Sequence, residues 1–348
     1  MRGEYDIPGG PRIIVDLEAE GGRIGSARFS GFEAVPGEVL EGASRSLIGA
    51  PSDAGVKELA ALIEGGLAPG GVLVGVTAAD LAVAVKRGLK RAVNWRDLDF
   101  DIIHGPELDP VVNVALDETL VEEVASGRRR PFVRLWEWNA PQVVIGSFQS
   151  YTNEVHPDGV ERHGIIVSRR VSGGGAMFME PANCITFSLV VPTALVEGLS
   201  FEQSYPFLDS WVMEALASVG VKATYVPLND IASERGKIGG AAQKRWSNGC
   251  MLHHVTMSYD VDSAKMKDVL RTGLDRLMDK GTASAVKHVD PMRSQIDLSR
   301  GEVIDAMIRT FAQKYRARRG ALSDEDIETA KARCAVKFST PEWIHRVP

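Results

Sequence analysis

Cysteine, positive charge and long apolar runs are all scarce in this sequence. Only three of the 348 residues are cysteines, Cys184, Cys250 and Cys334, and none of them form a CxxC pair. This supports neither a disulfide framework nor a zinc site, and it suits a reducing cytoplasm. With 40 Lys and Arg against 46 Asp and Glu, the net charge is −6, the opposite of what duplex nucleic-acid binding favours. We therefore expect no nucleic-acid partner.

Segments that would direct the chain to or through a membrane are also missing. No apolar run approaches the roughly 18 residues of a membrane span. The first six residues do not resemble a secretion signal. We therefore expect a mature, soluble, cytoplasmic protein without a membrane partner.

The composition that is present, 44% hydrophobic and 25% charged residues, is typical of globular proteins. At roughly 100–200 residues per domain, the length predicts two domains. Residues 1–94 are expected to form a small α+β domain, with a hairpin of strands 13–17 and 24–29 and helices over 56–63 and 78–89. Polar residues 95–105 are interpreted as a linker, and 106–348 as the second domain.

The second domain mixes strand and helix patterns without regular βα repeats. We therefore expect an α+β, or mixed α/β, fold with a mixed β-sheet and flanking helices. Helical spacing predicts helices over 113–124, 205–219, 265–278, 302–315 and 324–334, with Ser323 as the N-cap of the last. Strands are predicted over 131–138, 142–145, 165–167, 185–191 and 252–261.

The glycine-rich run around Gly173, Gly174 and Gly175 is the most informative segment. It follows a short buried strand, and bare backbone N–H groups there let a ligand approach closely. Arg169 and Arg170 directly precede it, and arginines suit phosphate or carboxylate oxygens. An ordinary glycine turn with a solvated arginine pair is the alternative. The run is neither a P-loop nor a dinucleotide-binding motif.

Two further segments carry possible site residues. Lys237 lies among glycines in an apolar stretch, where it can present a fixed positive charge to an oxyanion, although a turn lysine is the alternative. His253 and His254 are adjacent on a predicted strand, so they point to opposite faces and only one can face a site. A core histidine is the alternative for that pair.

Taken together, these segments resemble the lipoate–protein ligase family, to which biotin protein ligases and octanoyltransferases are related. The resemblance covers about 105–348. It is carried by the loop 169–176, by Asn183, by Asn229-Asp230 with the lysine segment 236–241, by the strand from His253, by the turn 280–284 and by Glu342-Trp343. Residues 9–32 and the helices after them resemble the family's small accessory domain, here at the N-terminus instead of after the Glu-Trp segment.

The resemblance implies a biotin/lipoate-ligase-like catalytic domain and an ATP-dependent reaction. Lipoate or octanoate would be activated to an acyl-AMP and transferred to a lysine of a lipoyl-domain carrier, either a 2-oxoacid dehydrogenase E2 or a glycine cleavage H-type protein. Lys237 is the implied catalytic residue. The implied substrate-binding residues are Arg170, Ser172, Gly173, Gly174, Gly175, Ala176, Asn183 and His254. The implied nucleotide-binding residues are Arg169, Asn229, Asp230, Lys237, Gly239 and Ala241, with Asp230 also a ligand for Mg²⁺.

Some residues depart from the family's pattern and leave alternatives open. Met179-Glu180 stands where His-Asp is frequent, which leaves the preferred acid open. An octanoyl- or lipoyltransferase that works without ATP through a cysteine thioester is one alternative. However, no cysteine stands where such relatives place their nucleophile. A non-catalytic binder of lipoate or of a nucleotide is the other.

Overall fold

The computed structural model describes residues 1–347 except 33, 68–70 and 272–287. The predicted turn at 280–284 and the end of the predicted helix 265–278 lie outside these described residues. The chain divides into two compact units, Met1–Leu98 with Thr193–Ser210, and Asp99–Pro192 with Trp211–Pro348. Both units combine strands and helices, so the predicted α+β class is confirmed.

In the first unit, the described part of residues 1–94 forms an antiparallel three-stranded sheet and three α-helices. The strands are β1 (Arg2–Asp6), β2 (Arg12–Glu20) and β3 (Arg23–Ser30), and the helices are α1 (Gly37–Ser46), α2 (Val56–Gly66) and α3 (Ala78–Leu89). Gly21 and Gly22 connect β2 to β3 with φ of 60° and 76°, a conformation that glycine adopts without steric cost. The predicted hairpin is therefore confirmed.

Residues 193–210 belong to the first unit although they come from the middle of the chain. They comprise η2 (Thr193–Val196) and the first part of α7 (Phe201–Ser218). The buried guanidinium of Arg87 donates to the carbonyl oxygens of Leu195 at 2.9 Å and Glu197 at 3.0 Å. The range 95–105, interpreted as a linker, holds η1 (Trp95–Asp97) and most of β4 (Phe100–Leu108).

In the described part of the second unit, eight strands form one mixed sheet. In spatial order they are β10 (Thr224–Val226), β11 (Asp230–Ser233), β12 (Gly236–Arg245), β13 (Cys250–Ser258), β9 (Cys184–Pro192), β5 (Phe132–Trp138), β4 and β14 (Ala317–Arg319). β4 is parallel to β5 and to β14, and the other neighbours are antiparallel. A smaller sheet has the order β7 (Ile166–Arg169), β6 (Gln142–Ile145) and β8 (Met177–Met179).

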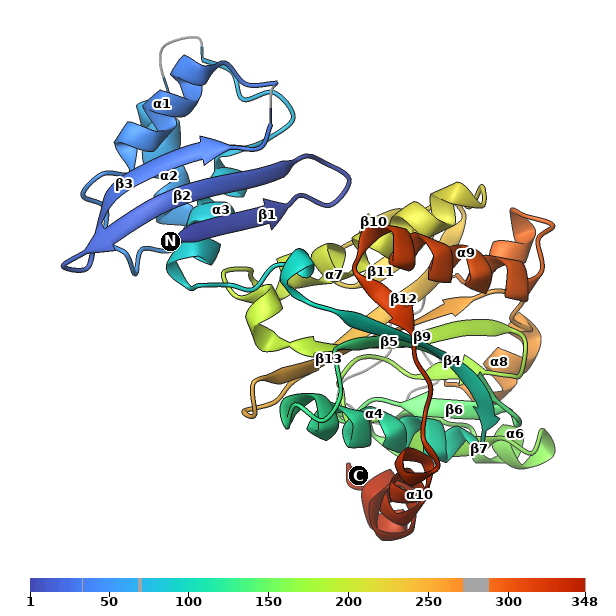
Figure 1. Ribbon diagram of the computed structural model, residues 1–348. Helices are drawn as coiled ribbons and strands as arrows, with labels where there is room; N and C mark the ends of the chain where they lie inside the picture. Colours follow the sequence, from blue (N-terminus) through green and yellow to red (C-terminus); the bar gives the residue numbers. More distant parts are fainter. Residues whose placement is uncertain (33, 68–70, 272–287, 348) are drawn as a thin grey trace. The chain divides into compact units, whose positions relative to one another are not determined.

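Helices cover both faces of the larger sheet (Figure 1). The Phe187 ring on β9 lies 5.0 Å from the Trp211 ring of α7, whereas Ser188 donates to Asp117 of α4 (Pro110–Ala125) at 2.6 Å. Successive strand residues point to opposite faces, so α7 and α4 lie on opposite sides. The other helices of the unit are α5 (Tyr151–Glu154), α6 (Pro157–Arg162), α8 (Ser263–Val269), η4 (Met292–Ser294), α9 (Arg300–Lys314), α10 (Asp324–Arg333), the π-helix η5 (Cys334–Phe338) and α11 (Pro341–Ile344), besides α4 (Pro110–Ala125) itself.

The helix boundaries follow local capping chemistry. Ser323, the predicted N-cap of α10, accepts a hydrogen bond from the Asp326 N–H at 3.1 Å, and the Asp326 carboxylate accepts from the Ser323 N–H at 2.7 Å. The same reciprocal pair joins Ser299 and Glu302 at the start of α9. Within the described residues, no helix is both long and apolar enough to cross a membrane.

Candidate active site

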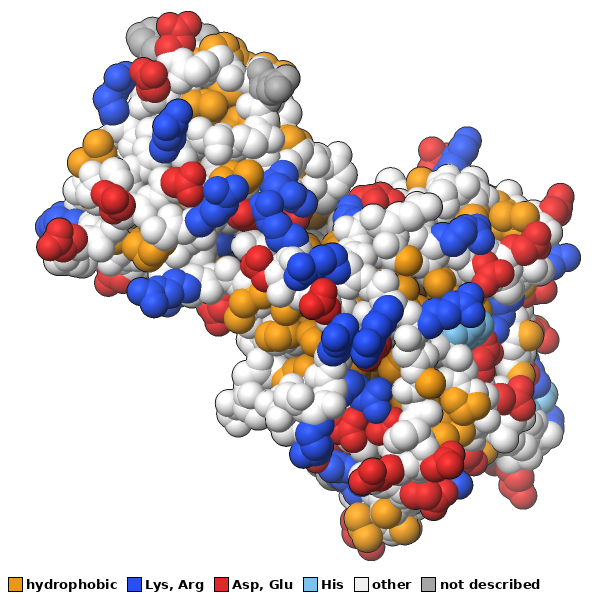
Figure 2. All heavy atoms as spheres, in the orientation of Figure 1, with side chains coloured by type: hydrophobic (Ala, Val, Ile, Leu, Met, Phe, Trp, Pro, Cys, Tyr) orange, Lys and Arg blue, Asp and Glu red, His pale blue; other side chains and the backbone are white. Residues whose placement is uncertain are grey.

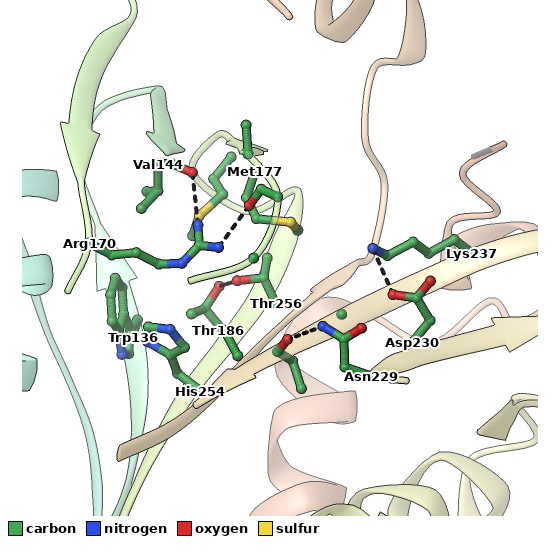
Figure 3. A pocket seen from close by; sticks show the side chains of 17 residues that line it. Trp136, Val144, Arg170, Met177, Thr186, Asn229, Asp230, Lys237, His254 and Thr256 are labelled. Carbon is green, nitrogen blue, oxygen red and sulfur yellow. Dashed lines mark hydrogen bonds and ion pairs between the residues drawn. The ribbon is translucent and has the colours of Figure 1, made fainter. Parts of the chain in front are cut away.

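An elongated cavity of about 280 Å³ lies in the second unit, between the glycine loop and the strands β12 and β13. Figure 3 shows two clusters of polar side chains at its opposite ends, one around Trp136, His254 and Arg170 and the other around Lys237 and Asp230. The described lining residues are Trp136, Val144, Arg170, Gly174, Gly175, Ala176, Met177, Met179, Thr186, Asn229, Asp230, Lys237, Gly240, Ala241, Ala242, His254 and Thr256.

The glycine loop forms one wall because backbone segments approach each other closely there. β7 leads into the loop, and the Ser147 N–H donates to the Ser172 carbonyl at 2.8 Å. A Cβ added at Gly146 would lie only 2.2 Å from the Gly174 carbonyl oxygen. Gly174 itself has a φ of 89°, which an L side chain rarely adopts. Glycine at both positions therefore allows the loop to close against the end of β6.

The Arg170 guanidinium orders this loop from inside. It donates to the carbonyl oxygens of Gly173 at 2.6 Å, Gly175 at 2.8 Å and Val144 at 3.1 Å. Its Nε also donates to the Ser172 hydroxyl at 3.1 Å. Arg170 thus lines the cavity, at the end away from Lys237, where a contact with the acid and not with the nucleotide stays the prediction.

Arg169, expected to contact the nucleotide, is instead buried behind the loop. Its guanidinium donates to the carbonyl oxygens of Gly146 at 2.8 Å, Gln149 at 2.7 Å and Ile344 at 2.9 Å. Burial, with the nearby charge of Arg346, lowers the pKa of Arg169 to about 10. The side chain is not among the described lining residues, so the cavity gives no support to the predicted nucleotide contact.

A buried hydrogen-bond chain supports the Trp136 end. The Ser172 hydroxyl lies 2.6 Å from His254 Nε2, and His254 Nδ1 lies 2.9 Å from Asp117 Oδ2. Asp117 Oδ1 accepts from Arg134 at 3.0 Å and from Ser188 at 2.6 Å. Arg134 is 1% exposed, and this chain compensates its buried charge.

The pKa directions identify the protonation states in this chain. Burial lowers the pKa of His254 despite the opposing effect of Asp117. For Asp117, burial alone would raise the pKa, but the hydrogen bond from His254 and the charge of Arg134 outweigh it and lower the pKa. His254 is therefore neutral at pH 7, with Nδ1–H donating to Asp117 and Nε2 accepting from Ser172.

The opposite end is built from β11 and β12. Lys237 Nζ forms an ion pair with Asp230 Oδ1 at 3.0 Å, and the lysine side chain remains 27% exposed. Backbone bonds fix the lysine, because its N–H donates to the His288 carbonyl at 2.7 Å and its carbonyl accepts from the Asp290 N–H at 2.9 Å. Asn229 closes this end, with its amide donating to the Ala241 carbonyl at 2.6 Å.

The register gives the distance between the two ends. His254 pairs with Ala242 on β12, and Lys237 lies five residues before Ala242. At roughly 3.3 Å per strand residue, the ends are about 16 Å apart. Val144, Met177 and Met179 add apolar side chains to the lining, and Figure 3 shows Val144 and Met177 near Arg170. This arrangement suits an extended apolar chain with a negatively charged head near the lysine.

The other predicted site residues are divided between the cavity wall and its support. Gly174, Gly175, Ala176, Asn229, Asp230, Lys237, Ala241 and His254 line it, whereas Ser172, Gly173, Asn183 and Gly239 do not. Ser172 supports His254, and Asn183 donates to Glu180 at 3.1 Å in the turn before β9. Asp117 was missed, although charged Arg134 in an apolar strand signals a buried acidic partner.

All three cysteines are buried, and none is among the described lining residues. Burial raises the pKa of Cys184 to about 12, and it raises those of Cys250 and Cys334 to about 11. A thiol with such a pKa is overwhelmingly protonated at pH 7 and a poor nucleophile. Among the described residues, no group of three or more His, Cys, Asp or Glu side chains is placed to hold a metal ion.

The chain is similar in sequence to known proteins. A family model described as the lipoyl protein ligase A/B catalytic domain matches residues 109–312. A probable lipoate-protein ligase A of Mycoplasma pneumoniae is 30% identical over 243 residues, 70% of each chain. The octanoyltransferase LipM of Halalkalibacterium halodurans is 24% identical over 280 residues, covering 72% of this chain and 99% of that protein.

Solved structures show the same fold. A bipartite lipoate protein ligase from Thermoplasma acidophilum, solved in a study that includes its E2 lipoyl domain, has a TM-score of 0.59 at 23% identity, covering 72% of this chain and 96% of that one. A lipoate-protein ligase A bound with ATP has a TM-score of 0.59 at 23% identity, covering 73% and 99%. The family model spans more than half of the sequence, and the chain therefore belongs to the lipoyl protein ligase A/B family.

Proposed function

We propose that this protein is an ATP-dependent lipoate–protein ligase that activates lipoate, or octanoate, as an acyl-adenylate and transfers the acyl group to a carrier-protein lysine. The observation that carries the proposal is the polarity of the cavity. A lysine charge stands at one end, about 16 Å from the Trp136 end. At that end the Arg170 and His254 side chains are hydrogen-bonded within the protein and Trp136 adds an aromatic surface, so we call it the apolar end. The relatives named as lipoate-protein ligases support the same activity.

In the first step, a carboxylate oxygen of the acid attacks the α-phosphorus of ATP and pyrophosphate leaves. Lys237 is the group suited to stabilise the negative charge that develops between the two anions. In the free protein Asp230 holds the lysine amino group in place, so little reorganisation is needed when the substrates bind.

Asp230 also has the chemistry to hold Mg²⁺. It is a 5% exposed carboxylate at the nucleotide end, and Mg²⁺ is commonly held by one or two carboxylates together with substrate phosphates. When bound, the ion would neutralise phosphate charge. The chain's own contribution is to hold Asp230 and Lys237 3.0 Å apart beside Asn229.

The apolar end is suited to the far part of the acyl chain. Both His254 ring nitrogens are engaged, so that residue presents a neutral ring to the cavity beside Trp136. Met177 and Met179 add polarizable thioethers, which adapt to irregular shapes. Met179 stands where His is frequent in the family, which makes this wall more apolar.

In the second step, the ε-amine of a carrier lysine attacks the acyl carbon, AMP leaves, and the amine loses a proton as the amide forms. The carrier we propose is a lipoyl domain, of the E2 or the H-type. A structural neighbour was studied together with its E2 lipoyl domain, which supports this class of partner.

An octanoyltransferase that uses a cysteine thioester is the second candidate, because LipM enzymes are among the relatives. That route needs a thiolate beside the acyl carbon. The three thiols are buried, have raised pKa values and lie outside the cavity wall. These observations favour the ligase.

The test compares two acyl donors. In the first reaction, the protein is incubated with Mg²⁺, ATP and lipoate or octanoate without a carrier, and the acyl-AMP and pyrophosphate formed are measured. An apo-lipoyl domain is then added, and its acylation is followed by mass spectrometry. A parallel reaction contains octanoylated acyl carrier protein and no ATP. We expect acyl-AMP and carrier modification in the first reaction alone. Modification in the second reaction alone would establish the transferase, and binding without any product would establish a silent binder.

A matched pair of lysine variants connects the result to the cavity. Lys237→Ala removes the charge at the nucleotide end, whereas Lys244→Ala alters a lysine on the same strand that does not line the cavity. We expect acyl-AMP formation to fall to a small residual rate in the first variant and to be kept in the second. Equal activity in both would contradict the assignment of Lys237.

A further inference from the structure

The C-terminal segment, residues 334–346, contacts the strand that leads into the glycine loop. The Arg169 guanidinium donates to the Ile344 carbonyl through Nε at 2.9 Å and through a terminal nitrogen at 2.5 Å. In the other direction, the Trp343 indole N–H donates to the Arg169 carbonyl at 2.8 Å. The segment therefore binds both the side chain and the backbone of Arg169.

These contacts lie one residue from the acyl-binding wall. The same guanidinium also donates to Gly146 and Gln149, so it joins the C-terminal segment to the turn after β6. The next residue, Arg170, holds the carbonyls of Gly173 and Gly175. A shift of the Arg169 backbone would thus move the residue that shapes the loop.

Two cationic side chains lie against the Trp343 ring, one from a residue before it in the sequence and one from a residue after it. Lys337 Nζ lies 4.4 Å from the ring centre, and the Arg346 guanidinium lies 4.8 Å from it. Lys337 also bonds to Glu118 of α4 at 2.7 Å and 2.9 Å. Glu118 follows Asp117, the partner of His254. The segment is therefore connected to both supports of the apolar end.

We propose that Trp343 is a positioning residue for acyl binding, acting through the Arg169 backbone on the glycine loop. Trp343 is not among the described lining residues. Its expected effect is on the affinity for the acid and not on ATP, because the loop borders the Trp136 end and Lys237 stands at the other. This inference rests on the proposed ligase function.

The decisive variant is Trp343→Phe in the full chain, which keeps an aromatic ring and removes the indole N–H. Lipoate binding is measured by calorimetry without ATP, and KM values for lipoate and ATP are measured by pyrophosphate release. We expect the Kd and KM for lipoate to rise, by at most about fivefold, because losing one hydrogen bond of about 1 kcal/mol lowers the population of the binding-competent loop by no more than that factor. The KM for ATP should change less than twofold, and discrimination among acids of six to ten carbons should weaken.

Trp246→Phe is the matched control. Trp246 is a half-buried tryptophan of the same core with Lys244 4.7 Å from its ring centre, and it does not line the cavity. An unchanged lipoate Kd in Trp343→Phe, an equal rise in both KM values, or the same shift in the control would overturn the proposal. A wild-type protein that binds lipoate without forming acyl-AMP would refute the ligase reaction and leave the positioning role testable by Kd.

Arg346→Gln keeps the test decisive if Trp343→Phe does not fold. Arg346 is exposed, and its substitution removes one cation from the Trp343 ring, a 3.5 Å contact to the Ser147 hydroxyl and a positive charge near Arg169, without disturbing the core. We expect the lipoate Kd to rise about twofold, at the lower end of what an exposed cation–π contact supports. No change in Kd in this folded variant would overturn the proposal.

Discussion

Replacing Gly240 by alanine would place a methyl group against the amino group of Lys237. The added Cβ would lie 2.8 Å from Nζ and 3.1 Å from Cε of Lys237, and 3.4 Å from Asp230 Oδ1. Ordinary carbon contacts begin near 3.5 Å, so the lysine must move by about 0.7 Å or more. The backbone need not move, because the close atoms are the end of a flexible side chain and Gly240 has no positive φ.

The expected loss is therefore in catalysis and not in stability. A displacement of about 1 Å at a reacting group costs up to about 100-fold in rate, and we expect lipoate-dependent pyrophosphate release to fall about 10- to 100-fold. Gly→Ala at a compatible backbone position stabilises by about 0.4–1 kcal/mol through the unfolded chain, so the melting temperature should stay level or rise.

A control and a double variant locate the effect. Gly301→Ala places a methyl group where nothing lies within 4 Å, and its adenylation rate should equal that of the wild type. If the Gly240 methyl acts through Lys237, the double variant Gly240→Ala/Lys237→Ala should be no slower than Lys237→Ala alone. Full activity in folded Gly240→Ala, or additive losses in the double variant, would refute this reasoning.

Three further predictions address the site. Lys237→Ala should reduce acyl-AMP formation to a small residual rate, measured by pyrophosphate release. Its unfolding free energy, measured by chemical denaturation, should change by less than about 1 kcal/mol, because the partly exposed side chain contributes charge and little packing. Replacing all three cysteines by alanine should leave the ligation rate near that of the wild type. The melting temperature of the protein should fall somewhat, because Cys184 is buried. A folded but inactive protein would favour the thioester route. Because the pKa of His254 is lowered, the unfolded chain takes up a proton below about pH 6.5 that the folded chain resists. The unfolding free energy, measured by urea denaturation, should therefore fall from pH 7 to pH 5 more in the wild type than in His254→Asn. An equal fall in both proteins would contradict the buried neutral histidine.

Local sequence patterns predicted the secondary structure of this protein well because the signals are themselves local. The glycine turn of the β2–β3 hairpin and the Ser323 cap of α10 are both found where the sequence indicated. The lysine among glycines was also recognisable, because Gly240 leaves room for the approach of Lys237 to Asp230. Such features depend on neighbours within a few residues, which a sequence displays directly.

Only the tertiary structure decided which charges face the cavity. Arg169 and Arg170 are adjacent in sequence and look alike, yet Arg169 donates to Ile344, 175 residues away, and lies behind the wall that Arg170 orders from inside. The pairing of Asp117 with His254 spans 137 residues. A buried guanidinium must be hydrogen-bonded, and any carbonyl oxygen that packs beside it can meet this requirement. Which carbonyl or ligand an arginine contacts therefore depends on distant parts of the chain, and the residues next to it in sequence do not determine it.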